Sequence, residues 1–178
     1  MAGLRTVKRS FSDPRVRKSV LRILRENVLC SMATIARGDR AHINTAYFCY
    51  SPAMEVYFLS DGSSLHCRNI ERNPSMAITI FRSTQTWGRP DRGLQLFGAC
   101  HPARGIQVSN AERLYGTRFP AYLRYTMSVR GEDRRTGNQL RSYQFYRFVP
   151  REVKILDERE FGGGVFIVAS LKARKGSR

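Results

Sequence analysis

The stretch YFLSDGSSLHCRNIERNP, residues 57–74, carries the strongest local signals in the chain. Its apolar first part predicts a strand that ends at Ser60, and the Asp-Gly pair that follows predicts a turn. Ser63 and Ser64 then open a short helix, which ends before Pro74 because proline disfavours helical backbone at the preceding residue. We therefore expect a strand end, a turn and a helix start to lie together.

The start of this helix is suited to an anion. Its first backbone N–H groups have no partner within the helix, and the helix dipole favours negative charge there. The hydroxyls of Ser63 and Ser64 can add donors, and His66 can add positive charge one turn inside. Arg68 is two residues further on and is expected to point elsewhere on the helix. The pattern indicates a phosphate cradle, although a serine that only caps the helix gives the same pattern.

The rest of the chain reads as a series of short strands joined by turns. A helix begins at Pro14 with Asp13 as its cap, and a capping box at Ser109 predicts a second helix to about Arg118. The segment 129–138 is polar, contains glycine and is expected to be mobile. Strands are expected at residues 28–36, 41–50, 54–60, 75–81, 93–100 and 142–149, with a further one at 151–157, and Gly162 to Gly164 form a turn before the apolar run 165–171.

This organisation predicts one mainly β (α+β) domain. Short strands with few helices favour a closed or partly closed antiparallel barrel, because closure removes the exposed strand edges that invite aggregation. The chain has 178 residues, which suits a single compact domain. We expect basic flexible tails at residues 1–11 and 172–178 and a folded domain over residues 12–171.

The chain is strongly basic, with a net charge of +17 and 31 Lys and Arg residues. Such a charge attracts phosphorylated cofactors, nucleic acid or acidic lipid. The basic residues are spread along the chain, so the charge does not mark one tract. The cysteines lack metal-ligand spacing and suit a reducing cytoplasm, and no apolar run is long enough to span a membrane. No metal site and no membrane partner are expected.

Taken in order, these motifs resemble the pyridoxamine 5'-phosphate oxidase-like split-barrel flavoproteins. The resemblance extends from about residue 28 to residue 103 and includes AHINTAYFCY (residues 41–50) and STQTWGRPDRGLQLFGA (residues 83–99) on either side of the cradle. The stretch from Tyr146 to Phe166, which includes FVPREVKILDEREFGGGVF, is similar to the C-terminal part of uncharacterised members.

The resemblance implies a six-stranded antiparallel split β-barrel with short flanking helices. It also implies a homodimer that binds flavin mononucleotide (FMN) at its interface. The cofactor-binding residues carried over by position are Asn44 and Thr45 along the ring, Ser60 near the flavin, Ser63, Ser64 and His66 at the phosphate, and Gln85 and Trp87 on an approaching loop. The family usually has Lys at the position of His66, and a neutral imidazole lacks that charge.

The function implied is an FMN-dependent oxidoreductase that acts on an unidentified small molecule, with no catalytic residue assigned. Tyr115 and Arg118 lie where the vitamin B6 oxidases hold their substrate phosphate, but the spacing differs and no Arg-x-His follows residue 100. Pyridoxine 5'-phosphate is therefore not the expected substrate. One alternative keeps the fold with deazaflavin or haem. Another is a non-enzymatic nucleic-acid-binding or regulatory protein that stacks bases on Tyr143, Tyr146 and Phe148; nucleic acid is the less expected partner.

Overall fold

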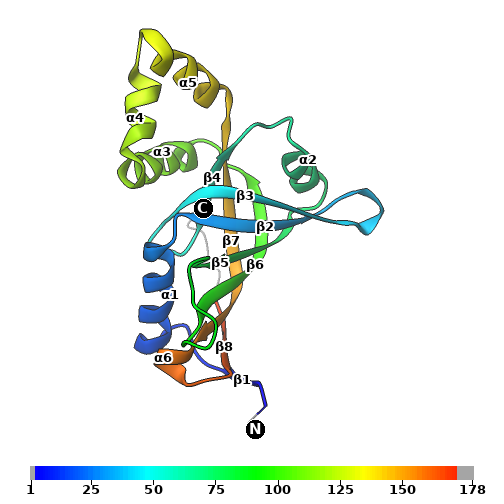
Figure 1. Ribbon diagram of the computed structural model, residues 1–178. Coiled ribbons are helices and arrows are strands. Elements are labelled where there is room, and N and C mark those ends of the chain that lie inside the picture. The colour runs from blue at the N-terminus through cyan, green and yellow to red at the C-terminus, as the bar shows by residue number, and fades with distance from the viewer. Residues whose placement is uncertain (1–2, 172–178) are drawn as a thin grey trace.

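A computed structural model describes residues 3–171 of the chain (Figure 1). The described strands are β1 (Arg5–Lys8), β2 (Leu29–Ile35), β3 (Ala41–Tyr50), β4 (Val56–Ser60), β5 (Ser75–Phe81), β6 (Arg92–Pro102), β7 (Gln144–Asp157) and β8 (Val165–Ser170). The helices are α1 (Pro14–Glu26), α2 (Leu65–Arg72), α3 (Ile106–Arg118), α4 (Pro120–Met127), α5 (Gly131–Ser142) and α6 (Glu158–Phe161), with a 3-10 turn at Arg37–Asp39. The fold is mainly β, as the sequence predicts.

Six strands close into an antiparallel barrel. The sheet runs in the order β7-β4-β3-β2-β5-β6, and pairing between β6 and β7 closes it. The first part of β7 pairs with β4, whereas its second part pairs with β8, which in turn pairs with β1. The predicted six-stranded barrel is therefore confirmed, and β8 and β1 extend it as two additional strands.

The barrel is split between β3 and β4. These strands pair only over Phe48–Tyr50 and Val56–Phe58. Residues 41–47 of β3 pair with β2 alone, so their other edge has no strand partner within residues 3–171. The β2–β3 hairpin extends away from the barrel at this point (Figure 1). An open strand edge leaves backbone donors and acceptors available beside α2.

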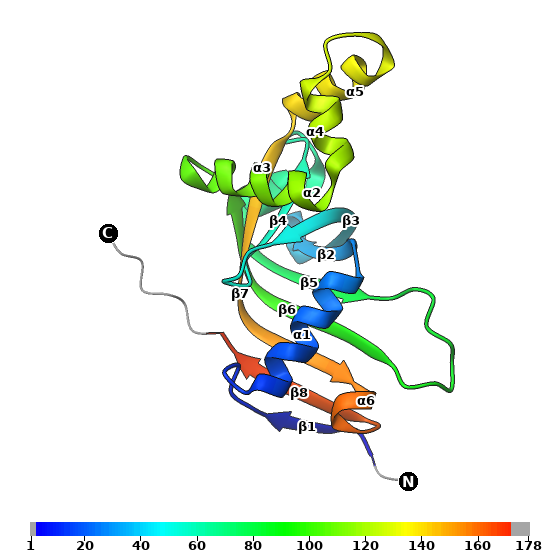
Figure 2. The ribbon, with the colours of Figure 1, turned by 90° about the vertical axis from the view of Figure 1, so that its left-hand side faces the viewer.

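Helix α1 closes the core from one side. Asp13 caps it, with Oδ1 accepting from the Arg15 N–H at 2.9 Å, and Pro14 occupies the first helical position as predicted. Its buried residues Val16, Val20, Ile23 and Leu24 share the main core with inward-facing side chains of the barrel strands. Figure 2 shows α1 lying across the strands of the lower barrel.

The predicted N-terminal tail needs correction within residues 1–11. Arg5–Lys8 form β1, which pairs in parallel with β8 in the register Arg5 to Val165 through Lys8 to Val168. The backbone edge of β8 pairs with residues 5–8, and a local sequence pattern cannot reveal this pairing. Residues 172–178, the other predicted tail, lie outside the described residues.

Three local predictions between residues 105 and 157 are also wrong. The segment 129–138 is largely helical in α5, where Gly137 fits against the Tyr125 carbonyl of α4. Helix α3 begins at Ile106, before the predicted capping box. Residues 142–149 and 151–157 belong largely to one strand that continues through Pro150, because β7 has a bulge there, where Arg151 is the extra residue between the pairs Phe97–Glu152 and Gly98–Pro150. A bulge tolerates the missing N–H of proline.

None of the helices described is long and apolar enough to cross a membrane.

Candidate functional site

The start of α2 brings two hydroxyls onto one imidazole. Ser60 Oγ lies 2.7 Å from His66 Nε2, and Ser64 Oγ lies 3.1 Å from the same nitrogen. Ser60 comes from the end of β4, Ser64 is the N-cap residue of α2, and His66 is in its first turn. Three of the predicted site residues are thus assembled by one strand–turn–helix unit.

The turn before α2 is fixed by Asp61. Its Oδ1 accepts from the Ser63 N–H at 2.8 Å, and its carbonyl accepts from the Ser64 N–H at 3.1 Å. The hydrogen bonds from Ser63 to the carboxylate lower the pKa of Asp61 below its ordinary value. The Ser64 hydroxyl makes no capping bond to the helix backbone. The first-turn amides of α2 and this hydroxyl therefore remain available to a ligand.

Buried contacts hold α2 in place against the barrel. The fully buried Asn69 donates from Nδ2 to Thr34 Oγ1 on β2 at 3.1 Å, and its Oδ1 accepts from Arg72 at 2.6 Å. Cys67 and Ile70 pack into the main core. The helix start is therefore positioned by rigid elements, as a pre-organised binding site requires.

Arg68 corrects one sequence-based expectation. Its guanidinium turns back and donates to the Ser63 carbonyl oxygen. Because the Arg68 side chain is long enough to reach back across the first turn, its charge stays near the helix start despite the two-residue offset from His66. Arg68 places a permanent positive charge at the mouth of the site.

His42 is a site residue that sequence reasoning missed. Its ring is parallel to that of His66, with 6.4 Å between the centroids. Burial, and secondarily the charge of His42, lower the pKa of His66 below 6.5. His66 is therefore neutral near pH 7 without a ligand. His42 and Asn44 are two residues apart and therefore lie on the same face of β3. This period-two spacing is the signal that could have revealed His42.

The two predicted residues on β3 face opposite sides of the strand. Asn44 points inward with His42, and its buried Oδ1 has no hydrogen-bond partner among the described residues. Thr45 is exposed on the outer face. Both lie on the open edge beside α2, so they can serve one ligand together only if Thr45 contributes its backbone.

Gln85 and Trp87 do not join this cluster within one chain. They lie on the exposed loop between β5 and β6, which both ribbon views place away from α2 (Figures 1 and 2). Gln85 Oε1 accepts from the Arg92 N–H at 2.6 Å, and the Trp87 side chain is 98% exposed. An exposed tryptophan is available to contact another molecule.

The outer face of the barrel carries an apolar groove of about 270 Å³. Its lining comes from β2, β3, β5 and β6 and includes Ile43, Ala77 and Phe97. Ile43 of β3 is 69% exposed. Phe81, which lies on the same face of β5 as Ala77, is 50% exposed. We refer to the surface formed by Ile43, Ala77, Phe81 and Phe97 as the outer apolar face. Exposed apolar surface of this kind indicates a contact with another molecule.

The barrel, its split and the cradle beside the split define the class: the chain has the split-barrel fold of the pyridoxamine 5'-phosphate oxidase-like proteins. No protein-family model and no curated protein matches the sequence. The likeness is therefore one of structure.

Three solved structures illustrate it. A relative of general stress protein 26, of the pyridoxinephosphate oxidase family, from Clostridium acetobutylicum is similar with a TM-score of 0.58 and 10% identity, over 85% of this chain and 92% of that one. The haem storage protein HutZ from Vibrio cholerae has a TM-score of 0.57 and 18% identity, over 75% and 88%. A haem-binding protein from Mycobacterium smegmatis has a TM-score of 0.63 and 13% identity, over 83% of this chain but only 56% of that protein.

Proposed function

We propose that this chain binds FMN at the start of α2 and acts, as a homodimer, as a flavin-dependent oxidoreductase for a small molecule. The observation that carries the proposal is the convergence of Ser60 and Ser64 on His66, at a helix start whose amides are free. Hydroxyls, amides and a titratable imidazole at one helix start suit a phosphate monoester.

The residues present fit a phosphorylated ring cofactor. Ser64, the first-turn amides of α2 and Arg68 would hold the phosphate. Gly62 fits this dense loop because a Cβ there would lie 2.6 Å from Gln144 Nε2. The open edge of β3 and the unpartnered Oδ1 of Asn44 would hold the polar edge of the ring, which carries donors and acceptors.

FMN, when bound, supplies hydride-transfer chemistry, and the protein contributes binding, orientation and electrostatics. Ser60 fixes the His66 ring through the 2.7 Å contact, so that the imidazole faces the helix start. His66 would take up a proton beside a dianionic phosphate, because the negative charge favours the imidazolium. The chain would thereby match its charge to the ligand.

The outer apolar face supports the proposed homodimer. Burying Ile43, Phe81 and Phe97 against a second copy would remove these exposed side chains from water. Because the β5–β6 loop lies away from α2 in its own chain, Gln85 and Trp87 would approach the flavin from the partner subunit.

Substrate recognition differs from that of the vitamin B6 oxidases. Tyr115 packs among Phe119 and Tyr122 in a second apolar cluster. Arg118 lies over the ring of Phe48 and donates to backbone carbonyls at the end of α1. Both side chains support the fold, which argues against pyridoxine 5'-phosphate and leaves the small molecule unidentified.

The test is FMN binding measured by fluorescence titration of the purified protein. The double variant Ser64→Ala/His66→Ala should bind FMN at least tenfold more weakly, because it loses two hydrogen bonds worth about 1 kcal/mol each. The matched control is His101→Ala/Ser170→Ala, which changes the same residue types at exposed strand positions. Equal affinity of the two variants would show that the phosphate binds elsewhere.

Haem is the second candidate, and a specific observation favours it. His42 and His66 lie side by side at the mouth of the site, and an imidazole is a common axial ligand of haem iron. Two of the similar structures are of a haem-binding and a haem storage protein. A Soret band in the purified protein, lost in His42→Ala and His66→Ala, would establish haem in place of flavin.

A further inference from the structure

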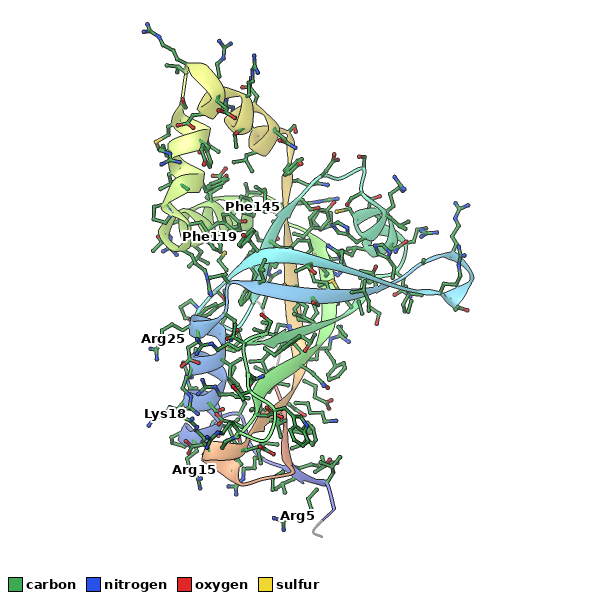
Figure 3. The ribbon with its side chains drawn as sticks, viewed as in Figure 1. Arg5, Arg15, Lys18, Arg25, Phe119 and Phe145 are labelled. Atoms are coloured by element: carbon green, nitrogen blue, oxygen red, sulfur yellow. The ribbon has the colours of Figure 1, made fainter. Side chains whose placement is uncertain are left out.

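The solvent face of α1 is almost entirely basic. The helix contains five basic residues and one acid, Glu26, which is paired with Arg92 of β6. Arg15, Lys18 and Arg25 lie on its exposed side, where Arg15 also pairs with Glu160, whereas Arg22 turns toward the buried Asp157. Figure 3 shows Arg15, Lys18 and Arg25 pointing away from the barrel along one side of the helix.

An arginine-lined hollow adjoins this face. It has a volume of about 470 Å³ and is bordered by Arg82, Arg89, Arg92 and Arg159, with Asp91 and Asp157 as its acids. Asp157 is fully buried and already neutralised, because its carboxylate binds Ser19 at 2.6 Å and pairs with Arg22 of α1. These contacts tie the hollow to α1. We call the exposed basic side chains of α1 the arginine face; the hollow is not part of it, because Gln85, which lines the hollow, lies on the loop assigned above to the partner subunit's flavin.

The arginine face lies on the opposite side of the barrel wall from the outer apolar face. Met76, Ile78 and Ile80 of β5 point inward to the core that α1 covers, whereas Ala77 and Phe81 alternate outward. Side chains on alternate positions of a strand face opposite sides. A dimer formed through the outer apolar face therefore leaves α1 free for another partner.

We propose that the arginine face binds the phosphodiester backbone of nucleic acid. Residues 15–25 of α1 span about 15 Å of helix axis, a length over which duplex DNA carries roughly nine phosphates. Over this length the duplex therefore offers more phosphates than α1 has basic side chains to contact them. The match is one of charge density, so recognition is independent of base sequence.

One observation favours nucleic acid over a lipid bilayer, and a second restricts the contact to the nucleic-acid backbone. None of the large exposed apolar side chains of residues 3–171 lies on α1, and docking to a bilayer requires such side chains to insert. Bases cannot stack on the aromatic strand residues Tyr146 and Phe148, because both side chains are fully buried. The contact is thus to the backbone, through residues that the charge pattern alone did not single out.

The experiment measures binding of a fluorescent 20-base-pair DNA duplex by anisotropy across a salt series, a probe length set at about two helical turns. The variant is Lys18→Gln/Arg25→Gln, since neither side chain is in an ion pair within the described residues. The matched control, Arg134→Gln/Arg135→Gln, removes the same charge from the exposed surface of α5.

We expect the variant to reduce the slope of log K against log salt by about 1.8, which is about a 30-fold loss of affinity at roughly 0.15 M salt. The control should change the slope by less than half as much. All variants should keep the wild-type unfolding temperature, because the altered side chains are exposed.

Three outcomes would overturn the proposal. The wild-type protein does not bind the duplex, or the α1 variant and its control weaken binding equally, which would mean that only total charge matters. The third is that vesicles of anionic phospholipid, or an acidic polypeptide such as polyglutamate, compete for the arginine face more strongly than the duplex does.

Discussion

Replacing His66 by lysine should strengthen FMN binding and remove its dependence on pH. His66 is neutral near pH 7 because burial, reinforced by His42, lowers its pKa. It therefore offers the phosphate a neutral hydrogen bond unless it first takes up a proton. A lysine amino group in the same space, within reach of the Ser60 and Ser64 hydroxyls, carries its charge at every relevant pH.

The magnitude follows from the kind of hydrogen bond. A neutral hydrogen bond contributes about 0.5–1.5 kcal/mol, and one to a charged group about 1.5–3 kcal/mol. The gain at about pH 8 is therefore about 1 kcal/mol, or roughly a fivefold lower Kd. Bound FMN raises the proton affinity of His66, so the wild-type complex holds more protons than the free protein. Wild-type affinity should accordingly rise as the pH falls from about 8 to about 6.5.

The assay is fluorescence titration of FMN at several pH values above about 6.5, where the flavin phosphate is still largely dianionic. His101→Lys, at an exposed position on β6, controls for the added charge. If His66→Lys bound FMN with the wild-type affinity and the same pH profile, His66 would not contact the phosphate and the cradle would be misplaced.

Three further predictions concern the frame that holds the site. Asp157→Asn leaves Arg22 without its buried partner and should lower the free energy of unfolding by about 3 kcal/mol in urea denaturation; a loss below about 1 kcal/mol would contradict this. Gly98→Ala would place a Cβ 2.2 Å from the Val149 carbonyl oxygen at the bulge, and calorimetry should show a loss of about 2 kcal/mol rather than none. Ile43→Arg should convert the proposed dimer to a monomer in sedimentation. Val129→Arg, at a similarly exposed position between α4 and α5, should leave the dimer intact.

Local chemistry was sufficient to predict most of the barrel. The strand at Ala41–Tyr50 and the helix beginning at Pro14 follow from alternation, turn residues and a capping aspartate. The strand over Ser75–Phe81 was predicted with the bounds that the structure gives it. In each case the backbone preference and the burial pattern agree, so tertiary contacts do not override the local signal.

The failures occur where a distant segment decides the outcome. Arg5–Lys8 become a strand only because the edge of β8 is open to them. The polar segment after Val129 becomes helix α5 because it packs on α4, with Gly137 at the close approach. The β8 edge is remote in sequence; α4 is adjacent along the chain, but its packing on α5 cannot be read from the residue pattern of either segment alone.

The candidate site shows the same division. Ser60, Ser64 and His66 come together because seven consecutive positions contain all three, so the sequence could predict their proximity. His42 reaches His66 across the split of the barrel, which only strand pairing determines. Gln85 and Trp87 lie away from α2 in one chain, and the proposal that they belong to the site requires a second copy.

The most direct measurement is a crystal structure of the protein grown with FMN. It should show the flavin phosphate at the amides of Leu65 and His66 beside the Ser64 hydroxyl, with the ring along the open edge of β3 and a second chain covering it. A monomer whose α2 start is filled by its own side chains, or a flavin bound at another surface, would contradict the proposed function.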